Sequence, residues 1–267
     1  MSQRREAAIV GIHEYPLRVA PGVSSLQIKA ASAAKALSDA GLNWQDVDAV
    51  YDTGTHQNIG GLGISEYLGL KPDLIDTTSV GGSSYEFQAN HAATMIATGK
   101  ANVALLTYGS TAHSDRRAIG TGGATGQGLP TPFNNMEDPW GMTLISNYGM
   151  VKARHMHQYG TTDEQFANIS VATRYHAMRN PEAVKAMTDL EFVDVNEITT
   201  QDVIDSRLIA WPLHLLECCM VSDGGGAVVI ASKEVAANCS KKPVWIIGGG
   251  EATKYRENGG DITVSAG

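Results

Sequence analysis

The sequence predicts an α/β protein in which a mostly parallel β-sheet is covered by helices on both faces. Short apolar segments recur along the chain of 267 residues, and segments with helical spacing of apolar residues lie between them. Several of the apolar segments are hydrophobic at successive positions, which is typical of strands buried on both faces. Strands that alternate with helices favour a parallel sheet, and the length allows a sizeable core.

The first 112 residues carry the clearest alternation. Leu26, Ala33 and Leu37 share one face of a predicted helix, and Gly41 ends that helix as its C′ residue. The stretch TTSVGGSSYEFQANHAATMIATG, residues 77–99, predicts a strand end, a glycine turn and an amphipathic helix. Further strands are expected at residues 7–12, 48–54, 73–80 and 101–110. One short helix is expected at residues 63–70.

The character of the sequence changes after His113. Residues 113–139 are rich in Gly, Pro, Asn and Thr and predict a long loop, which is usually functional or an excursion from the core. Of the two helices that follow, the second is expected to open with a capping box from Thr161 to Glu164 and to stop before Pro181. An irregular stretch then leads to a final strand. These two helices and the strand are expected within residues 142–160, 161–180 and 226–231.

The segment that begins near Val244 resembles the start of the chain. KKPVWIIGGGEATKYRENGG and REAAIVGIHEYPLRVAPG both have a charged lead, a short apolar strand and a glycine, followed by polar residues and an aromatic. A duplicated fold whose second half is missing is one interpretation. The alternative is that any strand followed by a glycine turn produces this pattern.

Composition excludes several classes of protein. The formal net charge of −8 argues against nucleic acid as the main partner. Since no apolar run approaches the ~20 residues of a membrane span, and the N-terminal run is too short for a secretory signal, we expect no membrane association and a cytoplasmic location. Cys218, Cys219 and Cys239 have no metal-binding spacing and are expected to be reduced, mostly buried thiols, with no metal site.

In their order and spacing, five segments of the chain resemble the thiolase superfamily, in particular its sterol-carrier or lipid-transfer branch. The segments are AIVGIHEYP, GGSSYEFQANHAATMIATGKANVALLTYGS, YGMVKARHMHQYGTTDEQFANISVATRYHAMRNP, PLHLLECCMVSDGGGAVVIAS and VWIIGGGEAT. The resemblance implies a thiolase-like layered αβαβα architecture with a loop domain inserted in the first half. The implied domains are the first part of the N-terminal core at residues 1–112, the inserted loop domain at 113–200, the completing strands of that core at 201–240, and the start of the C-terminal half at 241–267.

The resemblance also places a nucleophilic cysteine where this chain has none. By segment match that cysteine falls at Gly82 or, with a one-residue gap, at Ser83, and the next glycine of the motif falls at Tyr85. Such a cysteine lies at a helix N-terminus, where unpaired N–H groups and the helix dipole stabilise an anion. Without the thiol there is no acyl-enzyme and no ordinary thiolysis.

The candidate catalytic residues are Ser83, Ser84 and Tyr85. The spacing Ser83-x-x-Glu86 predicts a capping box, and the alternatives for a serine here are an oxyanion or acyl contact and a covalent nucleophile. A serine nucleophile needs a base within hydrogen-bond range, whereas His91 lies ~12 Å along the same helix. Tyr85 either packs as an aromatic or donates a hydrogen bond into the pocket.

A Cys-less branch of the superfamily implies a reaction: its aldolases shorten steroid side chains and work with a zinc-ribbon/OB-fold partner. We therefore expect retro-aldol cleavage of a β-hydroxyacyl-CoA, in which coenzyme A is part of the substrate and donors stabilise a thioester enolate. Acyl transfer and a non-catalytic lipid- or acyl-CoA-binding subunit are the alternatives. The resemblance also implies a homodimer and a C-terminal half, in trans or missing from this chain, that carries the acid and base residues.

The candidates for binding coenzyme A lie within or after the implied loop domain, which begins at residue 113. The match places Cys219 beside pantetheine, and Asn147 and Tyr148 near the junction of the acyl group and pantetheine. Packing in the core is the alternative for each of them. The cations available for a phosphate of coenzyme A are Arg116, Arg117, Lys152, Arg154 and Arg174.

Overall fold

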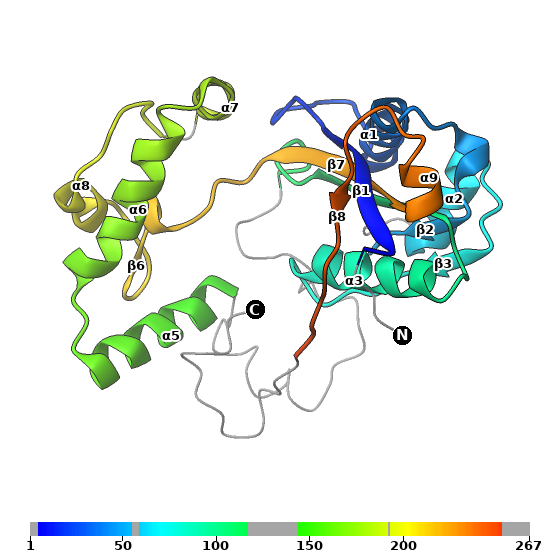
Figure 1. The fold of residues 1–267 in the computed structure, drawn as a ribbon. Coiled ribbons are helices and arrows are strands. Elements are labelled where there is room, and N and C mark those ends of the chain that lie inside the picture. Colours follow the sequence, from blue (N-terminus) through cyan, green and yellow to red (C-terminus); the bar gives the residue numbers. More distant parts are fainter. Residues whose placement is uncertain (1–4, 55–58, 117–143, 192, 253–267) are drawn as a thin grey trace. The chain divides into compact units, whose positions relative to one another are not determined.

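The computed structural model describes residues 5–54, 59–116, 144–191 and 193–252. These residues form two compact units (Figure 1). The first unit contains the described residues up to Ser114 and those from Asp223 onward, and the second unit runs from Asp115 to Ser222. The long glycine-rich loop predicted at residues 113–139 falls mostly on residues 117–139, which lie outside the described residues.

The first unit is built on a six-stranded sheet with the strand order β3-β2-β4-β7-β1-β8. Its strands are β1 (Ala7–Glu14), β2 (Ala49–Tyr51), β3 (Leu74–Asp76), β4 (Val103–Thr111), β7 (Asp223–Ser232) and β8 (Val244–Trp245). The helices of the unit are α1 (Ser25–Ala40), α2 (Gly60–Leu68), α3 (Ser84–Ala97) and α9 (Lys233–Ala236), with a 3₁₀ turn at Trp44–Asp46. The α/β class predicted from the sequence is confirmed.

The prediction of a mostly parallel sheet is wrong. Strand β2 runs parallel to β3 and to β4, but β7 is antiparallel to both β4 and β1, and β8 is antiparallel to β1. The parallel strands are joined by helices that carry the chain back across the sheet. Strand β4 instead ends at Thr111 directly opposite Asp223, where β7 begins. The chain therefore leaves and re-enters the sheet at the same end, and β7 must run in the opposite direction.

Helices cover both faces of this sheet, as the sequence predicts. One apolar cluster joins α1, α2 and α9 to one face, around Leu37, Ile64 and Val229. A second cluster joins α3 to the other face, around Ala93, Leu106 and Ile230 (Figure 1). The strand side chains are therefore buried on both sides, which accounts for their continuous hydrophobicity.

Helix α1 shows how local sequence sets its bounds. Ser24 is the N-cap and forms a capping box with Gln27, and Gly41 adopts the left-handed conformation with a φ of 77°. Glycine tolerates this conformation without steric cost, so the predicted stop at Gly41 is confirmed. In the described residues, none of the helices is both long enough and apolar enough to cross a bilayer.

The second unit is mainly helical. Its elements are α5 (Leu144–Tyr159), α6 (Asp163–Ala177), α7 (Pro181–Leu190), α8 (Thr200–Asp205), the two-stranded sheet of β5 (Leu208–Ala210) and β6 (Leu213–His214), and a 3₁₀ turn at Leu215–Glu217. The capping box of α6 uses Thr162 and Gln165 rather than Thr161 and Glu164, because Thr162 has the extended backbone of an N-cap. The stretch after Pro181, predicted to be irregular, opens with α7.

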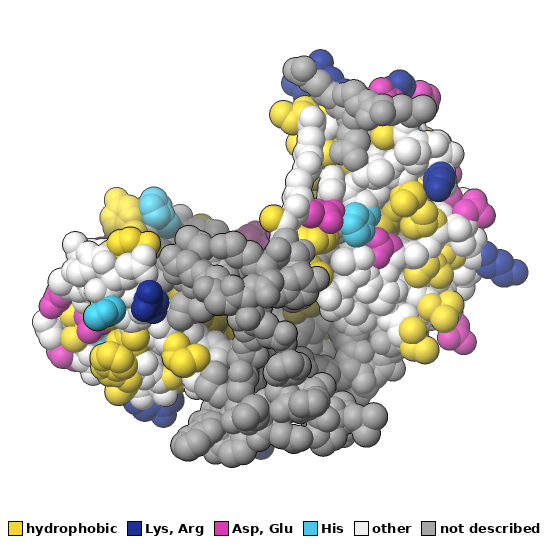
Figure 2. All heavy atoms as spheres, turned by 90° about the horizontal axis from the view of Figure 1, so that it is seen from below, with side chains coloured by type: hydrophobic (Ala, Val, Ile, Leu, Met, Phe, Trp, Pro, Cys, Tyr) yellow, Lys and Arg dark blue, Asp and Glu magenta, His cyan; other side chains and the backbone are white. Residues whose placement is uncertain are grey.

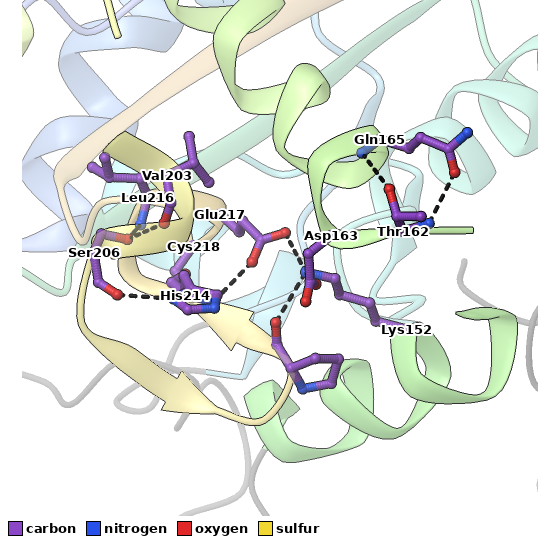
Figure 3. A network of polar contacts seen from close by, with 11 residues as sticks. Lys152, Thr162, Asp163, Gln165, Val203, Ser206, His214, Leu216, Glu217 and Cys218 are labelled. Carbon is purple, nitrogen blue, oxygen red and sulfur yellow. Dashed lines mark hydrogen bonds and ion pairs between the residues drawn. The ribbon is translucent and has the colours of Figure 1, made fainter. Parts of the chain in front are cut away.

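A buried lysine links three parts of the second unit (Figure 3). The Nζ atom of Lys152 on α5 lies 2.6 Å from a carboxylate oxygen of Glu217, 3.0 Å from Asp163 and 2.9 Å from the carbonyl oxygen of Pro212. Because its ammonium is used in this way, the prediction that Lys152 is available for a phosphate is wrong. Arg174 likewise donates to the backbone carbonyls of Asp194 and Asn196.

Candidate active site

The glycine turn before α3 is closed by Ser84. Its side chain is buried, and Oγ accepts the backbone N–H of Val80 at 2.8 Å and donates to the carbonyl oxygen of Gly81 at 2.5 Å. Gly81 has a φ of 87°, which L side chains rarely adopt. These two bonds explain why a serine at position 84 and a glycine at position 81 set the entry into the helix.

The predicted capping box of Ser83 and Glu86 is wrong. Ser83 is the N-cap residue, but its φ of −74° and ψ of −1° are helical, and its side chain makes no capping hydrogen bond. A capping oxygen reaches the N–H groups of the first turn only when the N-cap backbone is extended. In this helix the hydrogen bonds of Ser84 close the turn that a capping box was expected to close.

Gly82, one of the two positions at which the family resemblance places a thiol, opens on empty space. A Cβ atom added to Gly82 would meet no heavy atom within 4 Å, and both Gly81 and Gly82 line a pocket of about 840 Å³. The N–H groups of the first helical turn and the positive end of the helix dipole favour negative charge at this place. An anion held there would therefore be stabilised without any covalent bond to the protein.

Tyr85 both packs and forms a hydrogen bond, so the two alternatives of the sequence are combined. Its Oη lies 3.0 Å from Oγ1 of Thr53, and its ring packs edge-on against Tyr108 with the ring centroids 5.4 Å apart. Burial raises the pKa of Tyr85 above its ordinary value of 10.0, and the nearby charge of Asp52 raises it further, while the hydrogen bond to Thr53 opposes both. The hydroxyl is thus neutral and can donate a proton in a hydrogen bond.

The pocket lies in the first unit, on the α3 side of the sheet. Polar groups on its wall include Thr53, Tyr85 and Glu86, and the strands add His13 and Glu14 of β1 and Thr107 of β4; the other lining residues of β1, β4 and β7 are hydrophobic or glycine. Of the lining residues, Ile12 and Tyr108 are exposed by 60% and 43%. Figure 2, which views the molecule of Figure 1 from below, shows hydrophobic side chains at the surface of this unit. The pocket lining comprises Ile9, Ile12, His13, Glu14, Thr53, Gly81, Gly82, Tyr85, Glu86, Ala89, Leu106, Thr107, Tyr108, Gly226, Ala227, Val228 and Ile230.

His91 is held by acids rather than by a serine. Its Nδ1 lies 2.7 Å from Asp76, and its Nε2 lies 3.2 Å from Glu251, which also accepts from Asn90 at 2.7 Å. Burial lowers the pKa of His91, but the two carboxylates outweigh this effect, so the pKa lies above its ordinary value. Since both ring nitrogens contact carboxylates, His91 is not placed to activate Ser83.

The other predicted site residues lie in the second unit. Asn147 and Tyr148 are on α5, and the side-chain oxygen of Asn147 is buried without a hydrogen-bond partner in the described part of the chain, whereas Tyr148 is half exposed. Arg116 and Arg154 are exposed. Cys219 is a free thiol and is also exposed, so the expectation of mostly buried thiols fails for this residue. Arg117 lies outside the described residues.

No metal-binding cluster of three or more His, Cys, Asp or Glu side chains occurs among the described residues. Sequence reasoning missed the buried pair Lys29 and Asp52 and the half-buried Thr53, which together support Tyr85. A signal was present, because Lys29 is three residues after Leu26 and four before Ala33 on the apolar face of a predicted helix. A charged residue at such a place is buried only with a partner.

Comparisons with known proteins agree on the fold. None of the protein-family models matches the chain. The chain is 31% identical over 256 residues to the steroid side-chain-cleaving aldolase of Thermomonospora curvata, covering 94% of this chain and 63% of that protein. It is 33% identical over 253 residues to the 17-hydroxy-3-oxo-4-pregnene-20-carboxyl-CoA lyase of Mycobacterium tuberculosis, covering 90% of this chain and 61% of that protein. The chain therefore spans less than two thirds of the length of these relatives.

Solved structures show the same relationship. The Ltp2-ChsH2(DUF35) aldolase matches with a TM-score of 0.78 and 30% identity, covering 95% of this chain and 62% of that chain. A monomeric SCP2-thiolase-like protein of Mycobacterium smegmatis matches with a TM-score of 0.61 and 19% identity, covering 88% of this chain and 47% of that chain, which is evidence for the fold alone. The chain belongs to the thiolase superfamily: its fold is thiolase-like, and its homologues include steroid side-chain-cleaving aldolases.

Proposed function

We propose that this chain is part of an acyl-CoA carbon–carbon lyase that cleaves a β-hydroxyacyl-CoA by a retro-aldol reaction. The observation that carries the proposal is the glycine turn before α3: Gly82 opens on the pocket, and the residues at the two positions where the family resemblance places a nucleophilic cysteine are Gly82 and Ser83. Two relatives, a steroid side-chain-cleaving aldolase and a 17-hydroxy-3-oxo-4-pregnene-20-carboxyl-CoA lyase, support the same reaction class by their names. A steroid side chain is the acyl group that these names favour.

The reaction needs no bond between protein and substrate. A base removes the proton of the β-hydroxyl group, the Cα–Cβ bond breaks, and the hydroxyl carbon leaves as a ketone or aldehyde. The electron pair of the broken bond passes to Cα and is delocalised onto the thioester oxygen as an enolate. Protonation at Cα then gives a shortened acyl-CoA.

Residues around the pocket have a role in each part of this scheme. The N-terminal end of α3 stabilises the enolate oxygen, because its N–H groups and dipole favour negative charge. Tyr85, whose pKa is raised by burial, stays protonated, and when Thr53 donates to its oxygen the hydrogen of Tyr85 supplies a further donor. Ser84 is less suited to act as a nucleophile, since its hydroxyl already donates to Gly81. Ser83 is left as the serine on which an acyl transfer could depend.

Coenzyme A enters this proposal as part of the substrate. Cys219 is assigned to pantetheine, Tyr148 to the junction of the acyl group and pantetheine, and Arg116 and Arg154 to the phosphates of coenzyme A; all four side chains are exposed and accessible to a ligand. Asn147 joins them because its buried amide oxygen has no partner among the described residues. A small amide acceptor of this kind suits an N–H group of the pantetheine arm.

The complete enzyme is proposed to contain more than this chain. The four-domain division at residues 112, 200 and 240 is retained as part of the proposal, with a C-terminal half that supplies the acid and base residues. The matching aldolase structure is named after two proteins, Ltp2 and ChsH2, and this chain covers only 63% of the related aldolase. Both facts support a further partner, for which we propose a zinc-ribbon/OB-fold protein. We propose that the assembly is a homodimer of such pairs and is cytoplasmic.

Incubating the completed complex with a β-hydroxyacyl-CoA tests the proposal. The expected products are a ketone or aldehyde and an acyl-CoA shortened by the carbon atoms of that carbonyl compound, both identified by liquid chromatography and mass spectrometry. Tyr85→Phe serves as a variant that removes one donor and should slow cleavage. Tight binding of the acyl-CoA with no product would instead favour a non-catalytic acyl-CoA-binding subunit, and would reject the lyase.

A further inference from the structure

We infer that Lys29 is a positioning residue for the pocket: it fixes Asp52, and Asp52 in turn fixes the Thr53–Gly54 turn that holds the hydroxyl of Tyr85. The consequence for catalysis rests on the proposed function. The structural part of the inference does not, because it concerns where Tyr85 lies in this chain.

Lys29 and Asp52 form a fully buried ion pair. Nζ of Lys29 lies 2.7 Å from Oδ1 of Asp52, and the two side chains are exposed by 1% and 0%. Oδ1 also accepts the backbone N–H of Gly54 at 2.7 Å, and Oδ2 accepts the hydroxyl of Thr107 at 2.6 Å. Both carboxylate oxygens are thus bonded, and Asp52 is held from α1, from β4 and from its own turn.

The fold makes room for this lysine. A Cβ atom at Gly109 of β4 would lie 2.9 Å from Cγ of Lys29 and 2.5 Å from the carbonyl oxygen of Ser25, so α1 can approach β4 only over a glycine. Helix α1 packs on one face of the sheet, whereas α3 packs on the other (Figure 1). The ion pair therefore connects the helix on the far face with the turn that borders the pocket.

The turn after β2 carries this connection to Tyr85. Gly54 has a φ of 77°, and its N–H bonds the side chain two residues earlier, which is the geometry of an Asx turn. Thr53 is the residue between them, and its Oγ1 lies 3.0 Å from Oη of Tyr85. Thr53 and Tyr85 both line the pocket. A shift of the Asp52 carboxylate would therefore move the group that holds the tyrosine hydroxyl.

Stability alone does not require a charged pair here. Taking two charges out of water costs several kcal/mol per ion, and well-packed neutral side chains often replace a buried pair without loss of stability. What a neutral apolar pair cannot supply is a pair of fixed acceptors for Gly54 and Thr107. A carboxylate held by an ammonium supplies both, which is why we assign the pair to geometry rather than to stability.

A double-mutant cycle of Lys29→Met and Asp52→Asn tests this inference, with Lys35→Met as the control on the exposed side of the same helix. The first readout is the ¹³Cζ resonance of Tyr85 in the tyrosine-labelled chain, assigned with Tyr85→Phe. Each single variant should shift this resonance, because it leaves one buried charge unpaired. The double variant should return it toward the wild-type position, since an Asn amide can accept from Gly54 and donate to Thr107.

The second readout is the kinetics of the completed enzyme. Lys29→Met should lower kcat by on the order of 10- to 100-fold, with KM changed less than about threefold, and the double variant should recover most of kcat. An unchanged Tyr85 resonance in a folded Lys29→Met chain would overturn the inference. Thr53→Val removes only the last link, so an unshifted resonance in that variant also overturns it, whether or not Lys29→Met folds. Absence of any cleavage by the wild type would reject the proposed function but leave the resonance test intact.

Discussion

Replacing Ser84 by alanine removes the two hydrogen bonds that close the turn before α3. The hydroxyl accepts from Val80 at 2.8 Å and donates to Gly81 at 2.5 Å, and the side chain is fully buried. Each such bond contributes about 0.5–1.5 kcal/mol net, so the free energy of unfolding should fall by about 1–3 kcal/mol. The matched control is Ser83→Ala, which removes a hydroxyl without a capping hydrogen bond and should change stability by less than about 0.5 kcal/mol.

Urea unfolding of both variants, followed by circular dichroism, gives the two free energies directly. A Ser83→Ala variant that is less stable than Ser84→Ala would refute the assignment of the turn to Ser84. The same variants distinguish structure from chemistry, because neither hydroxyl is proposed to attack the substrate. Ser83→Ala in the completed enzyme should therefore retain its rate of cleavage within a few-fold, about what a small change in packing causes.

Three further predictions concern polar clusters outside the turn. Burial alone would raise the pKa of Asp223, but the hydrogen bonds that its carboxylate accepts from the backbone of Ala20 and from Ser114 hold this pKa below 3.8. The stabilising effect of these bonds should therefore be present above pH 3.8 and be lost as the pH falls through the lowered pKa. Acid unfolding of Asp223→Asn should accordingly show a weaker pH dependence in this range than that of the wild type. The pKa of His91 is raised above 6.5, so its contacts with Asp76 and Glu251 should stabilise the chain fully below pH 6.5 and weaken as the pH rises through the raised pKa. Amide hydrogen exchange of residues 246–251 should then become faster than the intrinsic effect of pH explains. The same increase in the variant His91→Gln would contradict the role of His91. Lys152→Met should destabilise the second unit by about 3–5 kcal/mol, because it leaves a buried carboxylate unpaired, and a melting temperature equal to that of the wild type would show that the link is dispensable.

Local signals in the sequence predict the helices of this protein better than the directions of its strands. The stop at Gly41 depends only on a residue that tolerates positive φ, and the structure confirms it. The start of α7 had a comparable signal in Asn180 followed by Pro181, an N-cap followed by proline at the first helical position, but the proline was interpreted only as the end of the previous helix. The direction of β7 has no local signal, because it depends on where the chain returns to the sheet.

The candidate site divides in the same way. The spacing Ser83-x-x-Glu86 predicts a capping box, but spacing does not encode the helical backbone at Ser83 that prevents it. Tyr85 was found through the family motif, whereas its partner Thr53 lies 32 residues earlier in the chain. The support by Lys29 joins residues on opposite faces of a sheet, and such contacts become visible only when the strand order is known.

The central claim is that the pocket cleaves a carbon–carbon bond without ever holding the substrate covalently. Intact-mass spectrometry tests this claim most directly, on the completed enzyme quenched during turnover of a β-hydroxyacyl-CoA. The account predicts that the mass of this chain stays that of the unmodified polypeptide while ketone or aldehyde accumulates. A chain heavier by the mass of the acyl group, with the ester located on Ser83 or Ser84, would contradict it.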